Sequence, residues 1–233
     1  MLSKLKQELQ DLADPERAKA NERFFKTGPG QYGEGDQFIG ITMPNLRKVA
    51  KKYLYLSLND VEELLHSEIH EFRMAALVIW TYQYEKADKT TKENIYTTYL
   101  NNTKYINNWD LVDVTTPRIV GQHLFNKDRK ILYQLAKSND LWEKRISILA
   151  TFWFIRNNQF EDTLKIATIL LNDSHDLIHK AVGWALREVG KKDQSVEEEF
   201  LKQHYNDMPR TMLRYAIERF PESLRKQYLH SQI

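Results

Sequence analysis

Apolar residues recur at intervals of three and four along almost the whole chain, and this spacing restricts the fold more than any other feature of the sequence. It is clear in "VEELLHS" at 61–67, "ISILATFWFI" at 146–155 and "DLIHKAVGWALREVG" at 176–190. Such a period places apolar side chains along one face of an α-helix, and no segment alternates as a strand would. The sequence therefore predicts an all-α fold.

The apolar helices also repeat. "FRMAAL", "KRISIL", "HKAVGW" and "LRYAIE" align, and their second positions are Arg73, Arg145, Lys180 and Arg214, with separations of 72, 35 and 34 residues. A member missing from the first gap would fall at Trp109, 36 residues after Arg73. A period near 35 residues with two helices in each unit predicts a HEAT-like or armadillo-type helical-repeat solenoid. We expect residues 1–233 to form one such domain.

Equivalent positions in successive repeats project to one side of a solenoid, so these five residues predict a mainly cationic stripe on a concave binding face. Asp113 follows Trp109 by four residues, Trp184 follows Lys180 by four, and Arg187 lies three further on, so each shares a helix face with a stripe residue. Cations suit phosphates and aromatic rings suit bases or sugars. Each of these cations could instead have a structural role, paired with a neighbouring acid. Leu77 and Leu149 follow Arg73 and Arg145 by four residues, so the aligned positions border the core.

Composition narrows the classes of function. The chain has no cysteine, which excludes disulfides and thiolate metal ligands. Its net charge of +2 does not indicate a strongly basic nucleic-acid-binding protein. The pattern "HSEIH" at 66–70 departs from the H-E-x-x-H spacing of zinc sites, so we expect no metal and no cofactor. No apolar segment reaches the roughly 18 residues of a membrane span, and the charged start predicts an intracellular, cytoplasmic protein.

Four of the eight glycines lie in "TGPGQYGEGD" at 27–36, which contains a literal G-x-G-x-x-G. A dinucleotide-binding loop must follow a strand and open a helix, whereas here "ERFFK" reads as a helix end and the next helix is expected only near Pro44. The match is therefore interpreted as accidental. We expect a glycine-rich loop over 27–43 between two N-terminal helices, serving either as a plain connection or as a segment that faces a ligand.

Three segments, "NNWDLVDV" at 107–114, "LWEKRISIL" at 141–149 and "HKAVGWALREVG" at 179–190, resemble the AlkD-like DNA alkylation repair family over roughly residues 15–225. The resemblance implies a C-shaped stack of HEAT-like repeats whose concave face binds duplex DNA. It implies hydrolytic excision of N3- or N7-alkylated purines, such as 3-methyladenine and 7-methylguanine, without extrusion of the base into a pocket. A single groove around a duplex is compatible with a monomer.

The resemblance also implies roles for individual residues. Asp113 corresponds to the catalytic aspartate, Trp109 and Trp184 to tryptophans that contact the deoxyribose of the lesion, and Arg145 to the arginine beside the aspartate. DNA contacts are implied or expected at these further positions: Phe24, Tyr32, Thr42, Arg47, Arg73, Lys180, Arg187 and Arg214.

The N-terminal part departs from the family pattern, since Phe24 stands where a tyrosine is expected and Thr42 where a glutamine is expected. These departures leave open a non-catalytic protein that binds distorted or branched DNA. A solenoid that binds a protein segment in its concave face is the third alternative. Excision assays and the salt dependence of DNA binding distinguish the three.

Overall fold

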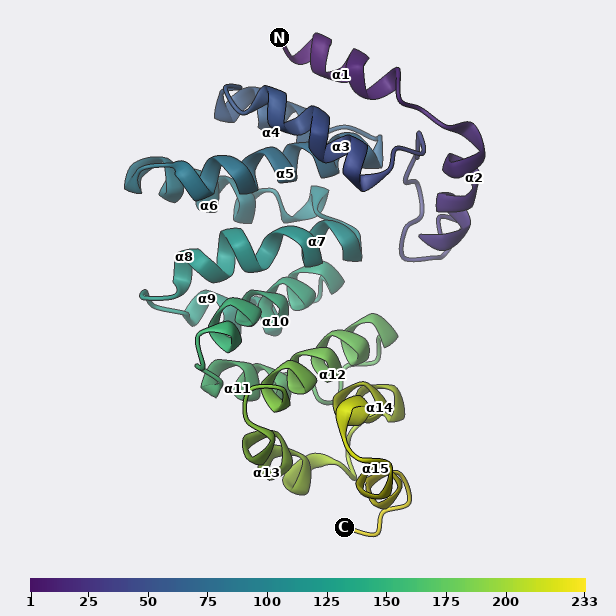
Figure 1. Cartoon of the computed structure of the whole chain (residues 1–233), viewed down its shortest axis with the longest axis vertical. Coiled ribbons are helices and arrows are strands. Elements are labelled where there is room, and N and C mark those ends of the chain that lie inside the picture. Colours follow the sequence, from purple (N-terminus) through teal and green to yellow (C-terminus); the bar gives the residue numbers. More distant parts are fainter. The chain divides into compact units, whose positions relative to one another are not determined.

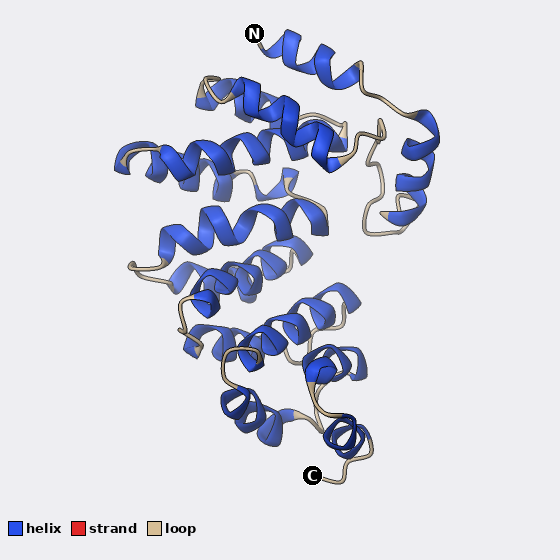
Figure 2. Cartoon of the chain, in the orientation of Figure 1, coloured by secondary structure: helices blue, strands red, loops and turns tan.

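The computed structural model describes all residues from 1 to 233, and its regular structure is entirely helical (Figures 1 and 2). The sole bridge of strand type is an isolated parallel pairing between Gln37 and Ile69. The all-α prediction is confirmed. No helix combines the length and the apolar character that crossing a membrane requires.

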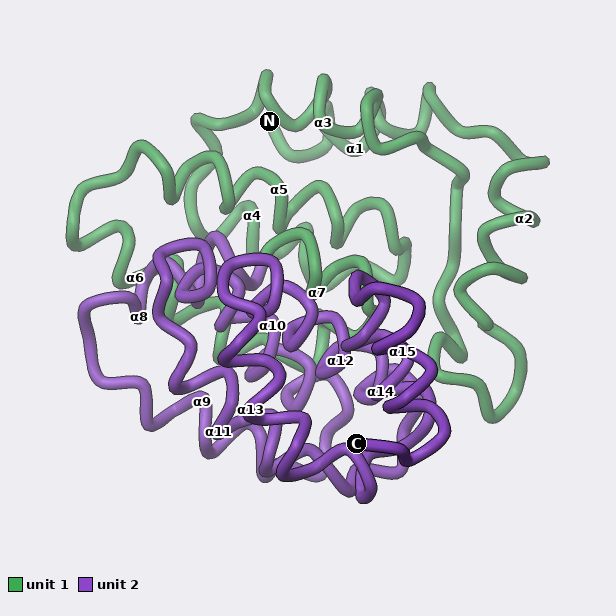
Figure 3. Tube along the Cα trace, turned by 60° about the horizontal axis from the view of Figure 1, so that its bottom comes forward, with its two compact units in different colours: residues 1–115 green, residues 116–233 purple.

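The chain divides into two compact units, residues 1–115 and residues 116–233 (Figure 3). The expectation that residues 1–233 form one domain stays a prediction, and each unit is described by itself.

The first unit contains a sequence of helices joined by short turns and one long loop. Its helices are α1 (Leu2–Gln10), α2 (Pro15–Phe24), α3 (Met43–Ala50), α4 (Leu58–Leu65), α5 (His70–Lys86), α6 (Lys89–Asn101) and α7 (Trp109–Thr116), with 3-10 turns at Lys51–Tyr53 and Thr103–Tyr105. The second unit begins with a π-helical turn (Pro117–Gly121) and continues through α8 (Gln122–Leu124), α9 (Lys130–Ala136), α10 (Leu141–Arg156), α11 (Glu161–Ile169), α12 (Asp176–Gly190), α13 (Gln194–His204), α14 (Arg210–Ala216), a 3-10 turn (Ile217–Arg219) and α15 (Glu222–Leu229).

Side-chain caps explain why several helices begin where they do. Asp14 accepts a hydrogen bond from the backbone N–H of Arg17 and precedes Pro15 at the first turn of α2. Ser57 and Asp60 form a reciprocal capping box at α4. Asp140 accepts from two backbone N–H groups at the start of α10. Such caps satisfy donors that a helix leaves without partners, and each contributes about 1 kcal/mol.

The predicted repeat register reappears in the second unit, where helix pairs stack. Arg145, Lys180 and Arg214 are each the fifth residue of α10, α12 and α14, and α12 packs against both α10 and α14. In the first unit, Arg73 lies in the first turn of α5 and Trp109 begins α7. The alignment therefore identified equivalent helix positions in the second unit, whereas Arg73 and Trp109 stand earlier in their helices.

The core of each unit is a long helix that is apolar on nearly all sides. In α5 the side chains from Ala75 to Trp80 are buried, and in α10 those from Ile146 to Phe152 are buried. A helix that is apolar all round must be covered on all sides, and the shorter helices of each unit provide that cover. In the first unit, α5 and the helices packed against it form a fixed frame for the loop between α2 and α3.

That loop occupies residues 25–42 and is fixed to the frame at its C-terminal end. Both carboxylate oxygens of Glu71 accept backbone N–H groups, from Ile39 at 3.1 Å and from Gly40 at 2.8 Å. Gly40 has φ +82°, and a Cβ there would lie 2.1 Å from the carbonyl oxygen of Asp14. The glycine is therefore required both by its backbone conformation and by a close approach of two chain segments.

Candidate functional site

An indole and a carboxylate, the side chains of Trp109 and Asp113, lie close together near the N-terminus of α7. Trp109 is the first residue of the helix and Asp113 follows one turn later, so the two side chains share a face, and both are partly exposed. The side chain of the preceding residue, Asn108, is buried and accepts the N–H of Trp109 at 2.8 Å. The start of the helix is thus held by its own flanking residue.

An aromatic row fixes the indole of Trp109. Its ring stacks on Phe25 with centroids 5.2 Å apart, Phe25 stacks on Phe38 at 4.9 Å, and Phe38 stacks on the imidazole of His70 at 4.5 Å. Phe24 meets Trp109 edge-on at 5.8 Å while remaining 64% exposed. Aromatic pairs of these geometries are worth about 0.5–1.5 kcal/mol each beyond the area that they bury. The row connects α7 with the loop and with α5.

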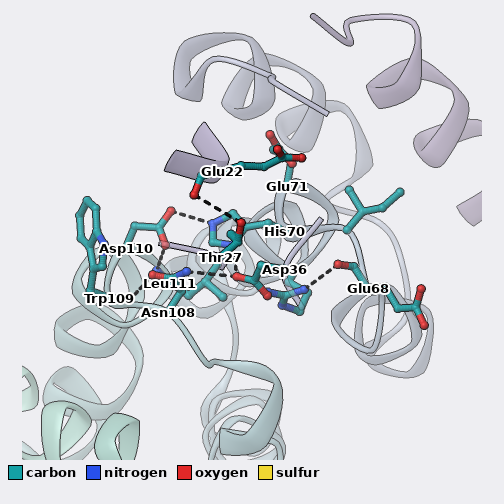
Figure 4. Close-up of polar contacts among 12 residues, drawn as sticks. Glu22, Thr27, Asp36, Glu68, His70, Glu71, Asn108, Trp109, Asp110 and Leu111 are labelled. Atoms are coloured by element: carbon teal, nitrogen blue, oxygen red, sulfur yellow. Dashed lines mark hydrogen bonds and ion pairs between the residues drawn. The ribbon is translucent and has the colours of Figure 1, made fainter. Parts of the chain in front are cut away.

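His70, the last ring of this row, also belongs to a network of charged and polar side chains (Figure 4). His70 contacts Asp36 through Nδ1 at 3.1 Å and Asp110 through Nε2 at 2.9 Å. Arg73 donates to Asp36 at 2.5 Å, and the Asn108 amide donates to the same carboxylate at 3.1 Å. Residues from the loop, α5 and the start of α7 are joined by these contacts.

The electrostatics of the network favour its charged form. Burial on its own disfavours a charged imidazole, but the charge of Asp110 and the hydrogen bonds to Asp110 and Asp36 raise the pKa of His70 to about 9. Burial likewise opposes ionisation of Asp36, yet the hydrogen bond from His70 and the charge of Arg73 lower its pKa. These shifts favour an imidazolium whose two nitrogens both donate, Nδ1 to Asp36 and Nε2 to Asp110.

Sequence reasoning missed most of this network. His70 belongs to the "HSEIH" segment, whose spacing indicates only that it is not a zinc site. The two histidines take unrelated partners, since His66 Nε2 bonds the side-chain oxygen of Asn102 at 2.7 Å. Nothing in the spacing of Asp36, His70 and Asp110 predicts that they meet. The one signal in the sequence is that α5, an otherwise apolar helix, begins with the polar residues His70, Glu71 and Arg73.

The expectation that Arg73 belongs to a surface stripe is wrong. Its side chain is 4% exposed, and besides Asp36 it donates to the carbonyl oxygens of Ser67 and Glu68. A buried guanidinium must satisfy its donors within the protein, and here it holds the loop to α5. Arg145 is buried too and donates to the carbonyl oxygen of Leu177 at 2.6 Å, so the surface stripe is wrong at this position as well.

The other predicted contacts of the second unit lie partly or fully at the surface. Trp184 is partly exposed on α12, its Nε1 donates to Glu188 at 3.1 Å, and Phe152 packs edge-on against it at 4.7 Å. Arg187 forms an ion pair with Glu218. Lys180 pairs with Asp176 at 2.6 Å and keeps 39% of its side chain exposed. Arg214 is exposed on α14.

The remaining predicted contacts lie in the first unit. Arg47, on α3, donates to the hydroxyl of Tyr82 at 3.3 Å. Tyr32, in the loop, is partly exposed, and its hydroxyl donates to the carbonyl oxygen of Phe24 at 3.4 Å. Thr42 precedes α3 and is partly exposed. Their roles toward DNA stay predictions.

The sequence matches a protein family described as DNA alkylation repair enzyme over residues 5–220. A solved structure described as "Predicted DNA alkylation repair enzyme from Enterococcus faecalis" aligns with a TM-score of 0.71 at 16% identity, covering 90% of this chain and 97% of that chain. At this identity the likeness establishes a shared fold. A search of curated proteins finds no match to the sequence.

Proposed function

We propose that this chain, which belongs to the family of DNA alkylation repair enzymes, is a DNA N-glycosylase that excises N3- and N7-alkylated purines from duplex DNA. Family membership supports a role in the repair of alkylated DNA. The finer assignment rests on one observation: a partly exposed carboxylate, Asp113, and an indole, Trp109, share one helix face, and the indole is fixed by buried partners.

The chemistry requires little beyond those two groups. Alkylation at N3 or N7 gives the purine a positive charge, so the base departs as a neutral molecule when the bond between C1′ and the base nitrogen breaks with its electron pair on the base. The sugar becomes an oxocarbenium-like cation, to which water adds with loss of a proton. A carboxylate stabilises that cation and orients the water, as carboxylates do in glycoside hydrolysis.

The indole ring acts on the same developing charge. A cation over an aromatic face gains about 0.5–2 kcal/mol, more when water is excluded. Because Trp109 is stacked on Phe25, it has little conformational entropy left to lose when the DNA binds. We assign Trp184 a sugar contact as well, and we assign DNA-backbone contacts to exposed cations such as Lys180 and Arg214. Arg145, buried on α10, keeps as a proposal the supporting role that the resemblance implies.

A base-excision assay tests this function directly. Duplex DNA carrying a single 7-methylguanine is incubated with the protein, and release of the free base is followed together with cleavage of the resulting abasic site. We expect release of the base. Tight, salt-dependent binding without release would instead establish a non-catalytic DNA-binding protein, and binding that is weak and insensitive to salt would favour a protein-binding scaffold.

A further inference from the structure

Hydrogen bonds that begin at His70 reach both chain neighbours of Trp109 (Figure 4). On one side, Nε2 of His70 lies 2.9 Å from Oδ2 of Asp110, while Oδ1 of the same carboxylate accepts the backbone N–H of Leu111 at 2.9 Å. Asp110 lies in the first turn of α7, where the backbone N–H groups have no partner within the helix. The histidine therefore holds the carboxylate that serves the start of α7.

On the other side, three hydrogen bonds lead from His70 to the backbone of Trp109 itself. Nδ1 of His70 lies 3.1 Å from Oδ2 of Asp36, and the Asn108 amide donates to this same oxygen at 3.1 Å. The side-chain oxygen of Asn108 then accepts the N–H of Trp109 at 2.8 Å. Because Asp36 and Asn108 are buried, these bonds are formed away from bulk water and hold the backbone firmly.

The same imidazole ends the aromatic row that supports the indole. Phe38 stacks on His70 with centroids 4.5 Å apart, and Phe25, which stacks on the indole, has its centroid 5.1 Å from that of the imidazole. A cation over the face of a phenylalanine ring is attracted to it, so a charged imidazole stabilises the row as well. His70 therefore acts on both the ring and the backbone of Trp109.

Charged side chains on four segments lie near His70: Asp36 in the loop, Arg17 on α2, Glu71 and Arg73 on α5, and Asp110 on α7. The two aspartates contact the imidazole, whereas both oxygens of Glu71 accept backbone N–H groups and Arg73 donates to Asp36. Burial and the charge of Arg73 disfavour the imidazolium, but the contacts with Asp110 and Asp36 outweigh them and raise the pKa of His70 to about 9.

We propose that His70 is a positioning residue of the excision reaction: by donating from both imidazole nitrogens, it holds Trp109 and, one turn further along α7, Asp113 against the sugar of the lesion. The proposal rests on the proposed function. A neutral imidazole donates from one nitrogen only, so deprotonation leaves one carboxylate without its donor and releases one chain neighbour of Trp109. Catalytic groups displaced by about 1 Å can lose about 10²-fold in rate, so the rate of excision depends on this proton.

Single-turnover excision of 7-methylguanine, with the protein in excess over the duplex, measures the chemical step without product release. We expect His70→Gln to lower the rate constant at pH 7 by about ten- to a hundred-fold, while affinity for the duplex changes by less than about two-fold. His66→Gln, in the same segment but at an exposed position bonded to Asn102, is the matched control and should excise at the wild-type rate. Equal rates for His70→Gln and the wild type, or equal losses in both variants, overturn the proposal.

The pH profile provides a readout that a merely structural role of His70 would not move. The ratio of the wild-type rate constant to that of His70→Gln is taken at each pH, so that any titration of the substrate cancels. We expect this ratio to be largest near neutral pH and to fall as pH rises through about 9, because the wild type then loses the proton that the variant never had. A ratio that stays constant from pH 7 to pH 10 contradicts the proposal.

A measurement without DNA separates this proposal from the proposed function. The five tryptophans are replaced by 5-fluorotryptophan, and the ¹⁹F NMR signal of Trp109 is assigned with Trp109→Phe. We expect the signal to shift with a midpoint at about pH 9 in the wild type and not in His70→Gln. A Trp109 signal that does not titrate in the wild type overturns the proposal. A titrating signal without any excision by the wild type refutes the glycosylase function and leaves the positioning of Trp109 by His70 standing.

Asp110→Asn serves as the second variant should His70→Gln fail to fold. Its side chain is 16% exposed, so the substitution removes one of the two carboxylates that His70 contacts with little change in packing. We expect excision at pH 7 to slow in this variant as well, again with duplex affinity retained. An Asp110→Asn protein that excises at the wild-type rate contradicts the proposal.

Discussion

His70 donates through Nε2 to Asp110 at 2.9 Å, and Asp110 directly follows Trp109 in the chain. On the other side of Trp109, Asn108 donates to Asp36, the second carboxylate that His70 contacts. Both neighbours of the indole are therefore attached to one buried network. The position of Trp109 therefore depends on the hydrogen bonds that its two chain neighbours make to this network.

This network predicts a dependence of stability on pH. Because the folded-state pKa of His70, about 9, lies above the usual value near 6.5, its contribution is complete below pH 6.5 and is lost as pH rises to about 9. A shift of this size corresponds to a contribution on the order of 3 kcal/mol. The free energy of unfolding, measured by urea titration at several pH values, should fall across that window.

The variant His70→Gln isolates this contribution, because glutamine does not titrate. We expect lower stability at pH 6.5, because Asp110 and Asp36 both lose the imidazolium between them, and a shallower fall between pH 6.5 and 9. His230→Gln, at an exposed position near the C-terminus, is the matched control and should follow the wild type. An unchanged slope in His70→Gln would show that the histidine is not the group that titrates.

Asp113→Asn tests the proposed chemistry. The amide keeps the shape of the side chain but loses the negative charge that opposes the sugar cation, so excision of 7-methylguanine should slow by about 10²–10³-fold. Affinity for the duplex, measured by fluorescence anisotropy, should change by no more than a few-fold. Asp128→Asn, at an exposed turn where the carboxylate pairs with Lys130, is the control that should excise normally.

Glu197→Gln should stabilise the second unit at neutral pH. Burial, together with the neighbouring Glu198, raises the pKa of Glu197 to about 8, so the folded state must keep a proton that the unfolded state releases. Stability is therefore lost as pH rises from the usual value near 4.5 to about 8, and the substitution should recover about 1–3 kcal/mol at pH 7. Thermal unfolding at pH 5 and pH 7 measures the difference, which should nearly vanish at pH 5.

Substitutions of Arg73 and Arg214 should distinguish a cation with a structural role from one that contacts DNA. Arg73→Met leaves Asp36 buried without its guanidinium and should cost about 3–5 kcal/mol of stability. Arg214→Ala, at an exposed position, should leave the unfolding midpoint unchanged and reduce the slope of log affinity against log salt by about 1. An Arg214→Ala protein with an unchanged salt slope would remove this residue from the proposed DNA contacts.

Gly40 and Gly28, both in the loop, should tolerate a side chain to different extents. Gly40→Ala should lower stability by more than about 1–2 kcal/mol, because its positive φ is costly for alanine and the added Cβ would meet the backbone of Asp14 and Ala18. Gly28→Ala should change it little, since its nearest neighbour is the flexible end of Gln31. Similar losses in both variants would mean that the loop is not fixed where Gly40 lies.

Local patterns in the sequence predict the helices and their register, because the signals lie within a few residues of each other. The start of α2 after Asp14, the start of α4 after Ser57 and the equivalence of Arg145, Lys180 and Arg214 all depend on spacings of this kind. The extent of the loop follows in the same way from the helix ends on either side of it.

The buried network has no such local pattern. Asp36 lies 34 residues from His70 and 72 from Asn108, so the pairing arises from tertiary packing and leaves no periodic trace in the sequence. The leucines four residues after Arg73 and Arg145 indicate that these aligned positions border the core, and both arginines are buried. A cationic residue at the same position of successive helical repeats therefore indicates a structural role at least as readily as a ligand contact.

The loop between α2 and α3 consists of two parts with separate tasks. Its end is joined to α5 through Asp36 and Gly40, whereas Gly30 and Gly35, both at positive φ, have open space around them, and the N–H of Gly30 bonds the side chain of Glu34 nearby. Gly33, between those two glycines, is different, because a Cβ there would lie 2.5 Å from the carbonyl oxygen of Phe25, whose ring stacks on Trp109. In evolutionary terms, the surroundings of Gly30 and Gly35 leave room for new side chains, whereas Gly33 and Gly40 are each constrained by a close backbone approach.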